Sequence, residues 1–297
     1  MRNLKVIFIV AICVCSFNQT SEAKPHRKKP KVLFISIDGW HASLAEEMPA
    51  VKELMENGSW TLEAEAPIPP ITVVSHAVIF TGAVPEKNGV VRYEPKRVKD
   101  WWPLKVRTVF QAVHIRNKKT AAFVQKLKVA AVLPSKSVDE FGLFRNKKKI
   151  VDNACAAINS DEPVYSLVFA HIEDLDATGH EYGWLSPEQK IAALSVDKAI
   201  ADLAYCARWS EKKSGIPVVM IIFGDHGGHR KTHGAAIKSD LQVPWIAVGA
   251  GIKAGYKIKG KVRLLDITPT ILKILGQNPA ILLPEAEGKI IKEIFTR

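Results

Sequence analysis

The chain has 297 residues, of which 47% are hydrophobic and 24% charged, and its formal net charge is +12. This size suits one large globular domain, or at most two, and the composition excludes a disordered or fibrous protein. The Lys and Arg residues are scattered along the chain without a nucleic-acid-binding motif. We therefore interpret the charge as a solvated basic surface that favours anionic substrates.

The amino-terminal residues have the pattern of a secretory signal. Arg2 and Lys5 precede an apolar run, Val6–Cys15, and small residues follow at Ser21 and Ala23. The run is too short for a membrane span, which needs about 20 residues. We predict a cleaved signal peptide over residues 1–23, a single domain over residues 24–297, and an exported protein that is periplasmic or secreted.

The mature chain would keep two cysteines, Cys155 and Cys206, both in segments with helical patterns. An oxidising compartment permits a disulfide between them. The sequence does not bring them together, and we expect two buried thiols instead.

Continuous apolar runs rich in Val, Ile and Phe recur along the chain without alternation. Such runs are typical of strands that are covered on both faces in a mostly parallel sheet. They predict strands at Val32–Ile37, Ala121–Val124, Ser166–His171, Val218–Phe223 and Trp245–Val248.

Helical patterns lie between these runs. They predict helices over Glu46–Asn57, Leu104–Arg116 and Asp266–Leu275, and a long helix that Ser186 caps. In the long helix, Ile191, Leu194, Val196, Ile200 and Leu203 are expected to share the buried side. The alternation of strands and helices predicts a three-layer α/β/α sandwich.

Seven side chains of the types that hold metal ions occur at, or soon after, the ends of these elements. In an open α/β sheet, ligands bind outside the carboxyl ends of the strands. Carboxylate and imidazole ligands together with a hydroxyl are expected of a two-metal phosphoryl-transfer site. The set comprises Asp38, Thr72, Asp176, His180, Asp225, His226 and His233.

Two members of the set have local competitors. Thr72 starts a helical pattern, where free amides attract a phosphate, and it is the candidate nucleophile. Ser75 is the alternative hydroxyl, but it lies most of a turn further along the helix. His229 competes with His233 for the last ligand position.

The motifs resemble those of the alkaline phosphatase superfamily, and in particular the type I phosphodiesterases and nucleotide pyrophosphatases. ISIDGW resembles the family's first strand and metal Asp, and TVVSHAVIFTG its nucleophile segment. DATGHEYG resembles its Asp-x-x-Gly-His motif, GDHGG its Asp-His pair, and HGAAIKSDLQVPW its last metal His, here His233. The motifs occur in the family's order and cover most of the mature chain.

The resemblance implies an alkaline phosphatase-like fold with two zinc ions. Asp176, His180 and His233 would hold one ion, and Asp38, Asp225 and His226 the other. Thr72 would attack phosphorus and form a phospho-threonine intermediate.

The substrate is less well defined. The Asn that usually holds a phosphate oxygen is replaced by Arg92-Tyr93, and the nearest Asn is Asn88. We predict substrate contacts from Arg92, Tyr93 and Trp40, with Trp184 available for the same apolar surface. This surface favours phosphoric diesters or nucleotide pyrophosphates. The alternatives are a phosphomonoesterase or phosphonate hydrolase with the same metals, and a catalytically silent binding protein of the same fold.

Overall fold

The computed structural model describes residues 28–91 and 104–296. Eight strands form one sheet in the order β4-β3-β5-β1-β6-β7-β2-β8, and β7 is antiparallel to both its neighbours while the other pairs are parallel. The expected mostly parallel sheet is therefore confirmed. Its strands are β1 (Lys31–Ile37), β2 (Gly58–Glu65), β3 (Lys119–Val124), β4 (Glu140–Leu143), β5 (Tyr165–Ile172), β6 (Val218–Gly224), β7 (Gln242–Gly249) and β8 (Tyr256–Lys257).

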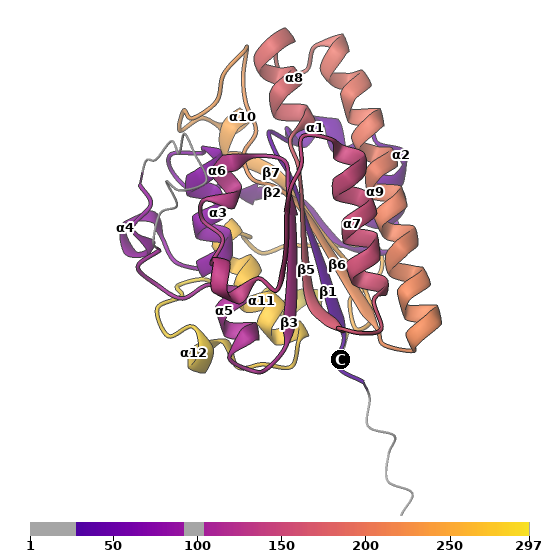
Figure 1. The fold of residues 1–297 in the computed structure, drawn as a ribbon. Helices are drawn as coiled ribbons and strands as arrows, with labels where there is room; N and C mark the ends of the chain where they lie inside the picture. Colours follow the sequence, from indigo (N-terminus) through magenta and orange to yellow (C-terminus); the bar gives the residue numbers. More distant parts are fainter. Residues whose placement is uncertain (1–27, 92–103, 297) are drawn as a thin grey trace, which may run out of the picture.

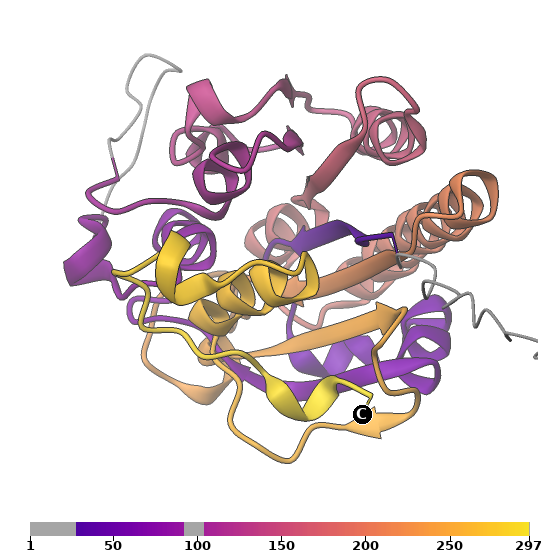
Figure 2. The same cartoon turned by 90° about the horizontal axis from the view of Figure 1, so that it is seen from below.

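Helices cover both faces of this sheet, as expected for an α/β/α sandwich (Figure 1). One face packs against α2 (Pro49–Glu56), α7 (Lys147–Asn159) and α9 (Pro187–Ser214). The other packs against α3 (Thr72–Thr81), α5 (Val109–His114) and α11 (Ile267–Ile274), and Figure 2 shows these layers from below. Each face has its own buried apolar core because the central strands carry Val, Ile, Leu and Phe on both sides.

The remaining short elements lie in the connections between these. They are α1 (Ala42–Ala45), α4 (Pro85–Asn88), α6 (Leu127–Ala130), α8 (Asp174–Tyr182), α10 (Lys238–Leu241), α12 (Pro279–Leu282) and the 3-10 turns η2 (Ser135–Ser137), η3 (Leu264–Asp266) and η4 (Lys292–Ile294).

Two helix predictions were too long. The helix expected from Glu46 begins at Pro49, because the residue before a proline avoids the helical conformation. The helix expected from Leu104 begins after Thr108, whose hydroxyl accepts from the amide of Gln111 in a capping box.

The long helix α9 has the expected cap, with the Ser186 hydroxyl accepting from the Gln189 amide. Its buried side was only partly predicted. Val196, Ile200 and Leu203 are fully buried, whereas Ile191 and Leu194 are exposed. These two residues lie in the first turns of α9, on its solvent side.

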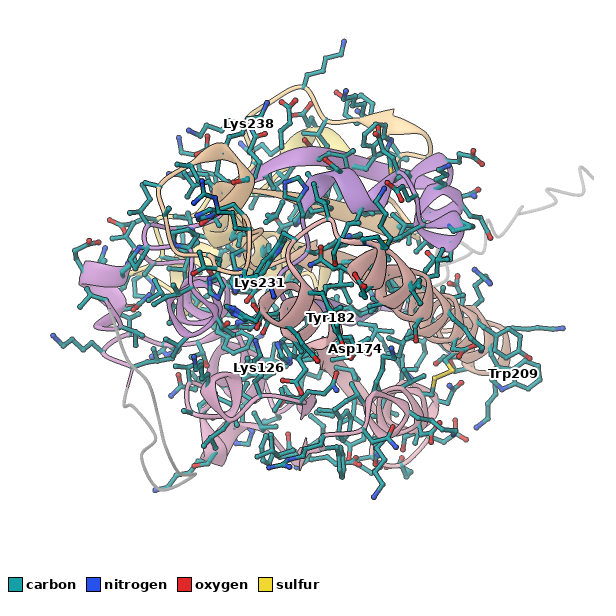
Figure 3. The ribbon with its side chains drawn as sticks, turned by 90° about the horizontal axis from the view of Figure 1, so that it is seen from above. Lys126, Asp174, Tyr182, Trp209, Lys231 and Lys238 are labelled. Carbon is teal, nitrogen blue, oxygen red and sulfur yellow. A yellow bond between two sulfur atoms is a disulfide. The ribbon has the colours of Figure 1, made fainter. Side chains whose placement is uncertain are left out.

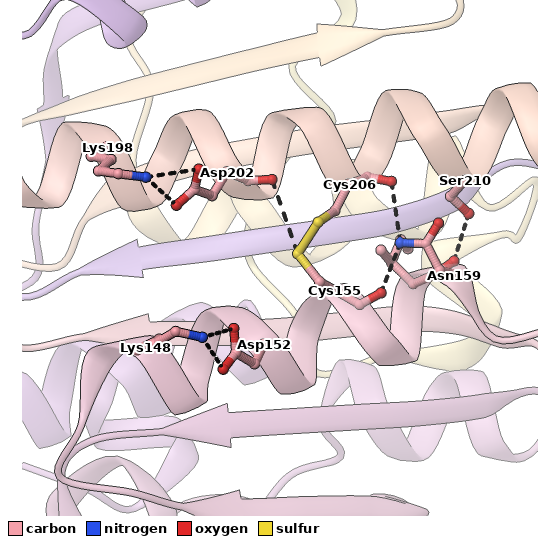
Figure 4. The surroundings of a disulfide bond; sticks show 9 residues. Lys148, Asp152, Cys155, Asn159, Lys198, Asp202, Cys206 and Ser210 are labelled. Carbon is pink, nitrogen blue, oxygen red and sulfur yellow. Dashed lines mark hydrogen bonds and ion pairs between the residues drawn. A yellow bond between two sulfur atoms is a disulfide. The ribbon is translucent and has the colours of Figure 1, made fainter.

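The expectation of two buried thiols is wrong. Cys155 on α7 and Cys206 on α9 form a disulfide, with 5.4 Å between their Cα atoms (Figure 4). The two helices lie side by side on one face of the sheet, and this packing brings residues 51 positions apart into bonding range. The Asn159 side-chain amide adds hydrogen bonds to the carbonyls of both cysteines.

Within residues 28–91 and 104–296, no helix combines the length and the apolar character needed to cross a bilayer. The predicted signal peptide lies outside the described residues.

Candidate metal centre and active site

The candidate ligands gather at the carboxyl ends of the three central strands. Asp38 follows β1, Asp225 follows β6, and Asp176 lies in α8 directly after β5. Because β1 pairs with β5 on one side and β6 on the other, Asp38 lies between the other two carboxylates. Figure 3 looks down on this end of the sheet, where Lys126 and Lys231 lie near the middle of the view.

Gly39 allows this close approach. Its φ is +70°, and a Cβ added there would lie only 2.7 Å from the Cα of Asp176. A residue with a side chain would therefore push α8 away from the end of β1. The Gly39 amide also donates to Asp225 Oδ1 at 3.1 Å, so the same position fixes two of the three carboxylates.

Each carboxylate is anchored through one oxygen and presents the other to the centre. Asp225 Oδ1 accepts from two backbone amides, and Asp225 Oδ2 is buried without a hydrogen bond. Asp176 Oδ2 contacts Lys126, and Asp176 Oδ1 is buried without a hydrogen bond. Asp38 Oδ2 accepts from His171 Nε2 at 3.0 Å, while Asp38 Oδ1 lies 3.3 Å from His226 Nε2. Buried carboxylate oxygens without hydrogen bonds are costly unless a cation binds them.

The three candidate histidines share an orientation that suits metal binding. In each ring, Nδ1 lies within hydrogen-bonding distance of a backbone carbonyl: His226 contacts Gly227 at 2.8 Å, His233 contacts Pro70 at 3.0 Å, and His180 contacts Lys231 at 3.0 Å. Each Nε2 then faces a carboxylate of the centre. A histidine that ligates a metal characteristically donates its other N–H in this way.

His229 has a different environment. Its Nδ1 contacts Asp240 Oδ1 at 2.8 Å, and this buried carboxylate is not one of the three in the centre. His233 Nε2 instead lies 3.5 Å from Asp176 Oδ1. The geometry therefore favours His233 over His229 as the ligand.

Two overlapping groups of ligand atoms, which share His226, are each compact enough to hold an ion. Asp38, Asp225 and His226 form one group, which is the whole of one expected set. Asp176, His226 and His233 form the other, with all ligand atoms of each group within 4.8 Å of one another. The expected His180 lies outside that second group, but its Nε2 is 3.4 Å from Asp176 Oδ1 and its side chain is 45% exposed. The donor set and the unbonded oxygens of Asp176 and Asp225 fit metal binding.

Thr72 lies at the edge of the first group. It is the first residue of α3, and its Oγ1 is 3.2 Å from His226 Nε2 and 3.5 Å from Asp38 Oδ1. Thr72 thus brings the amino-terminal end of α3 beside this group, and the free amides of a first helical turn can bind an anion. Ser75 is also buried, but its hydroxyl makes no hydrogen bond and is not among the contacts of the centre.

Three further residues of the centre were missed by the sequence analysis. Lys126 contacts Asp38 Oδ2 at 2.9 Å and also Asp176 Oδ2. His171 binds Asp38, and His76 contacts the Thr72 carbonyl at 2.7 Å and Ser36 Oγ at 3.0 Å. Lys126 follows the end of β3, so the rule that identified Asp38 and Asp225 could have found it. His171 is a polar residue inside an apolar strand, which is also a usable signal.

The predicted substrate contacts do not all agree with the structure. Trp40 is fully buried, so its assignment to a substrate surface is wrong, because it packs in the core beneath the site. Trp184 is also buried, and its Nε1 donates to the Gly39 carbonyl. Asn88 is buried and bonded to the backbone of its own loop. Arg92 and Tyr93 lie outside the described residues.

In the metal-free centre the charges are strongly coupled. Burial raises the pKa of Asp225 to about 7, and the neighbouring Asp38 carboxylate adds to this rise. Burial alone would lower the pKa of His226, but Asp225 and Asp38 raise it to about 9. Burial would raise the pKa of Asp38, but Lys126, His171 and His226 hold it well below its usual range. The raised pKa values show that His226 and Asp225 favour binding protons, and a metal ion would bind to the same side chains in place of these protons.

Fold and site together define an α/β protein with a candidate metal centre beside a threonine at the start of a helix. The chain belongs to the type I phosphodiesterase/nucleotide pyrophosphatase family, which matches residues 32–248. The expected family is therefore confirmed.

A curated relative is family member 1 of the ectonucleotide pyrophosphatase/phosphodiesterases of Mus musculus. It is 22% identical over 282 residues, which cover 86% of this chain but only 30% of the relative. The chain thus spans about a third of that protein's length.

Solved structures share the fold at lower identity. A murine ectonucleotide pyrophosphatase/phosphodiesterase 5, an inactive variant in complex with AMP, has a TM-score of 0.71 and 13% identity, covering 90% of this chain and all of that one. A 2-O glycosaminoglycan sulfatase has a TM-score of 0.67 and 14% identity over 88% of this chain and 76% of its own.

Proposed function

We propose that this protein is an exported two-zinc hydrolase that cleaves phosphoric diesters or nucleotide pyrophosphates. The observation that carries the proposal is the convergence of five ligand side chains in two compact groups, with His180 and Thr72 beside them. The free carboxylate oxygens of Asp176 and Asp225 are buried in these groups. Family membership supports the reaction class. The AMP complex of the structural neighbour supports a nucleotide substrate.

Zinc ions held by the two groups would offset the negative charge of the phosphoryl oxygens and favour ionisation of the Thr72 hydroxyl. Thr72 Oγ1 attacks phosphorus, the ester oxygen leaves with its substituent, and a phospho-threonine remains. A water molecule then attacks the same phosphorus and releases Thr72. His76 steadies the nucleophile, because its Nδ1 donates to the Thr72 carbonyl and its Nε2 accepts from Ser36.

The free amides at the start of α3 would hold a phosphoryl oxygen beside Thr72. Burial of this first turn keeps water away from the threonine, since Thr72, Val73 and Val74 are all buried. These features favour attack by the side chain over direct attack by solvent.

Export is supported by the disulfide between Cys155 and Cys206, because such bonds persist in oxidising compartments. The predicted signal over residues 1–23 agrees with this location.

Zinc-loaded mature protein should be assayed against an aryl phosphate monoester, an aryl diester and a dinucleotide. We expect metal-dependent cleavage of the diester and the dinucleotide that a chelator abolishes. Zinc binding without turnover of any substrate would identify the catalytically silent binding protein instead.

A monoester or phosphonate substrate remains the second candidate. Lys126 favours it, because a dianionic substrate needs an additional cation and this ammonium group lies in the centre. The two buried tryptophans also remove part of the aromatic surface expected for a diester.

A further inference from the structure

We infer that Lys126 is a substrate-recognising cation of the centre, selecting substrates that bring additional negative charge to the phosphoryl group. This inference rests on the two-metal hydrolase of the proposed function, and within it Lys126 favours the second candidate substrate class, phosphate monoesters.

The position of Lys126 is set by the chain around it. It follows β3 and caps α6, where its carbonyl accepts from the amides of Val129 and Ala130, each at 3.2 Å. From there its side chain reaches over the end of β5 to Asp38, which follows the next strand, β1. The side chain is only 16% exposed, so its charge is poorly screened by solvent.

Lys126 leaves the space for the metal ions free. It contacts the Oδ2 atoms of Asp38 and Asp176, one carboxylate from each expected ion site. The Oδ1 atoms of the same carboxylates face His226, His180 and His233. Lys126 and the ions therefore bind opposite oxygens of these carboxylates, and the ammonium can stay in place when the ions bind.

One N–H of Lys126 remains for a substrate. An ammonium group has three donors, and among the described residues two acceptors are in contact with it, Asp38 Oδ2 and Asp176 Oδ2. Asp38 contacts Lys126 through Oδ2 and Thr72 through Oδ1, so a single carboxylate separates the cation from the nucleophile. A phosphoryl group attached to or approaching Thr72 would therefore be one carboxylate away from this donor.

The charge balance of the centre supports the same role. Three carboxylates, from Asp38, Asp176 and Asp225, surround the proposed ions, and Lys126 offsets one of them. The net charge of the proposed ions and their ligands is then more positive by one than it would be without Lys126. A dianionic phosphate gains more from that charge than a monoanionic diester, because the interaction scales with the product of the charges.

The test compares Lys126→Met and the charge-retaining Lys126→Arg with a matched control, Lys147→Met. Lys147 also forms a half-buried ion pair with α8, contacting Asp174 Oδ1 and, at 2.9 Å, Ser195 Oγ. Its side chain is 18% exposed, close to the value for Lys126, but its partner is not a candidate ligand. If Lys126→Met does not fold, Lys126→Gln serves in its place.

Calorimetric titration of zinc-loaded protein with inorganic phosphate should show binding weakened by about tenfold or more in Lys126→Met, the size expected for one hydrogen bond to a charged group. Lys126→Arg should retain most of the binding, and Lys147→Met all of it. Zinc content should be unchanged in all three variants. The ratio of kcat/KM for an aryl monoester over an aryl diester should fall by a similar factor only in Lys126→Met.

An equal fall for both esters, unchanged phosphate binding, or loss of zinc from Lys126→Met would overturn the inference and leave Lys126 as a structural partner of the carboxylates. The phosphate titration needs no turnover, so it tests Lys126 separately. Wild-type protein that binds zinc and phosphate but cleaves neither ester would contradict the proposed hydrolysis alone.

Discussion

Thr72 and His226 are 154 residues apart in the chain, yet Thr72 Oγ1 lies 3.2 Å from His226 Nε2. The contact joins the first turn of α3 to the loop that follows β6. It places a hydroxyl beside a ring nitrogen whose partner Nδ1 is anchored on the Gly227 carbonyl. The candidate nucleophile and one candidate ligand are thus held by independent elements.

Thr72→Ala should lower turnover by at least about 1000-fold, because it removes the attacking oxygen. Zinc content should remain, since the six other side chains still supply the ligands. Thr72→Ser keeps the hydroxyl and should retain part of the activity. Steady-state kinetics with an aryl diester, alongside metal analysis, checks both variants.

Ser75→Ala is the matched control for Thr72, since Ser75 lies in the same helix and is buried without a hydrogen bond. An inactive Ser75→Ala together with an active Thr72→Ala would show that the nucleophile has been assigned to the wrong residue.

Asp225→Asn should lose zinc and activity. The asparagine has the same shape, but it replaces the negative charge that faces His226 through Oδ2 with a neutral amide. His180→Ala should also lose zinc, from the site that contains Asp176. Elemental analysis of the purified variants measures this, and His229→Ala, a histidine of the same loop bonded to Asp240, should keep both ions. Full zinc content in Asp225→Asn and His180→Ala would contradict the assignment of the ligands.

The stability of the metal-free protein should fall between pH 7 and pH 9. The pKa values of Asp225, about 7, and His226, about 9, are raised above their ordinary values of 3.8 and 6.5. The folded protein therefore keeps protons that the unfolded chain has released. The stabilisation from Asp225 is lost as the pH rises to about 7, and that from His226 is lost as the pH rises further to about 9.

Bound zinc would replace these protons, so the zinc-loaded protein should not show this loss. Calorimetry with zinc and with a chelator should give a difference in unfolding free energy that widens by about 2 kcal/mol from the lower to the higher pH. A constant difference would show that neither proton is coupled to the ion sites.

The double variant Cys155→Ser/Cys206→Ser should be less stable by about 4 kcal/mol, because the disulfide closes a loop with a sequence separation of 51. This corresponds to a fall in Tm of roughly 10 °C for a domain of this size. A reducing agent should lower the Tm of the wild-type protein similarly and leave the double variant unchanged. An effect of the reductant on the double variant would point to another cause.

The exported protein should begin at Lys24. The positive start, the apolar run Val6–Cys15 and the small residues before Lys24 together motivate this expectation. Intact-mass spectrometry of protein collected outside the cytoplasm measures the amino terminus, and a mass that still includes Met1 would refute it.

The sequence alone predicted five of the eight strands and most of the candidate centre. Buried strands of a parallel sheet carry long apolar runs, and a polar ligand type at the end of such a run is conspicuous, as with Asp38 and Asp225. Features that depend on contacts between distant elements could be found only in the tertiary structure. Lys126 reaches the centre only because β3 lies beside β5, and Cys155 meets Cys206 only because α7 packs along α9. Trp40 lies two residues after the candidate ligand Asp38, but its side chain is buried in the core. Neighbouring residues of a turn face different directions, and the packing of helices on the sheet decides which of them are buried.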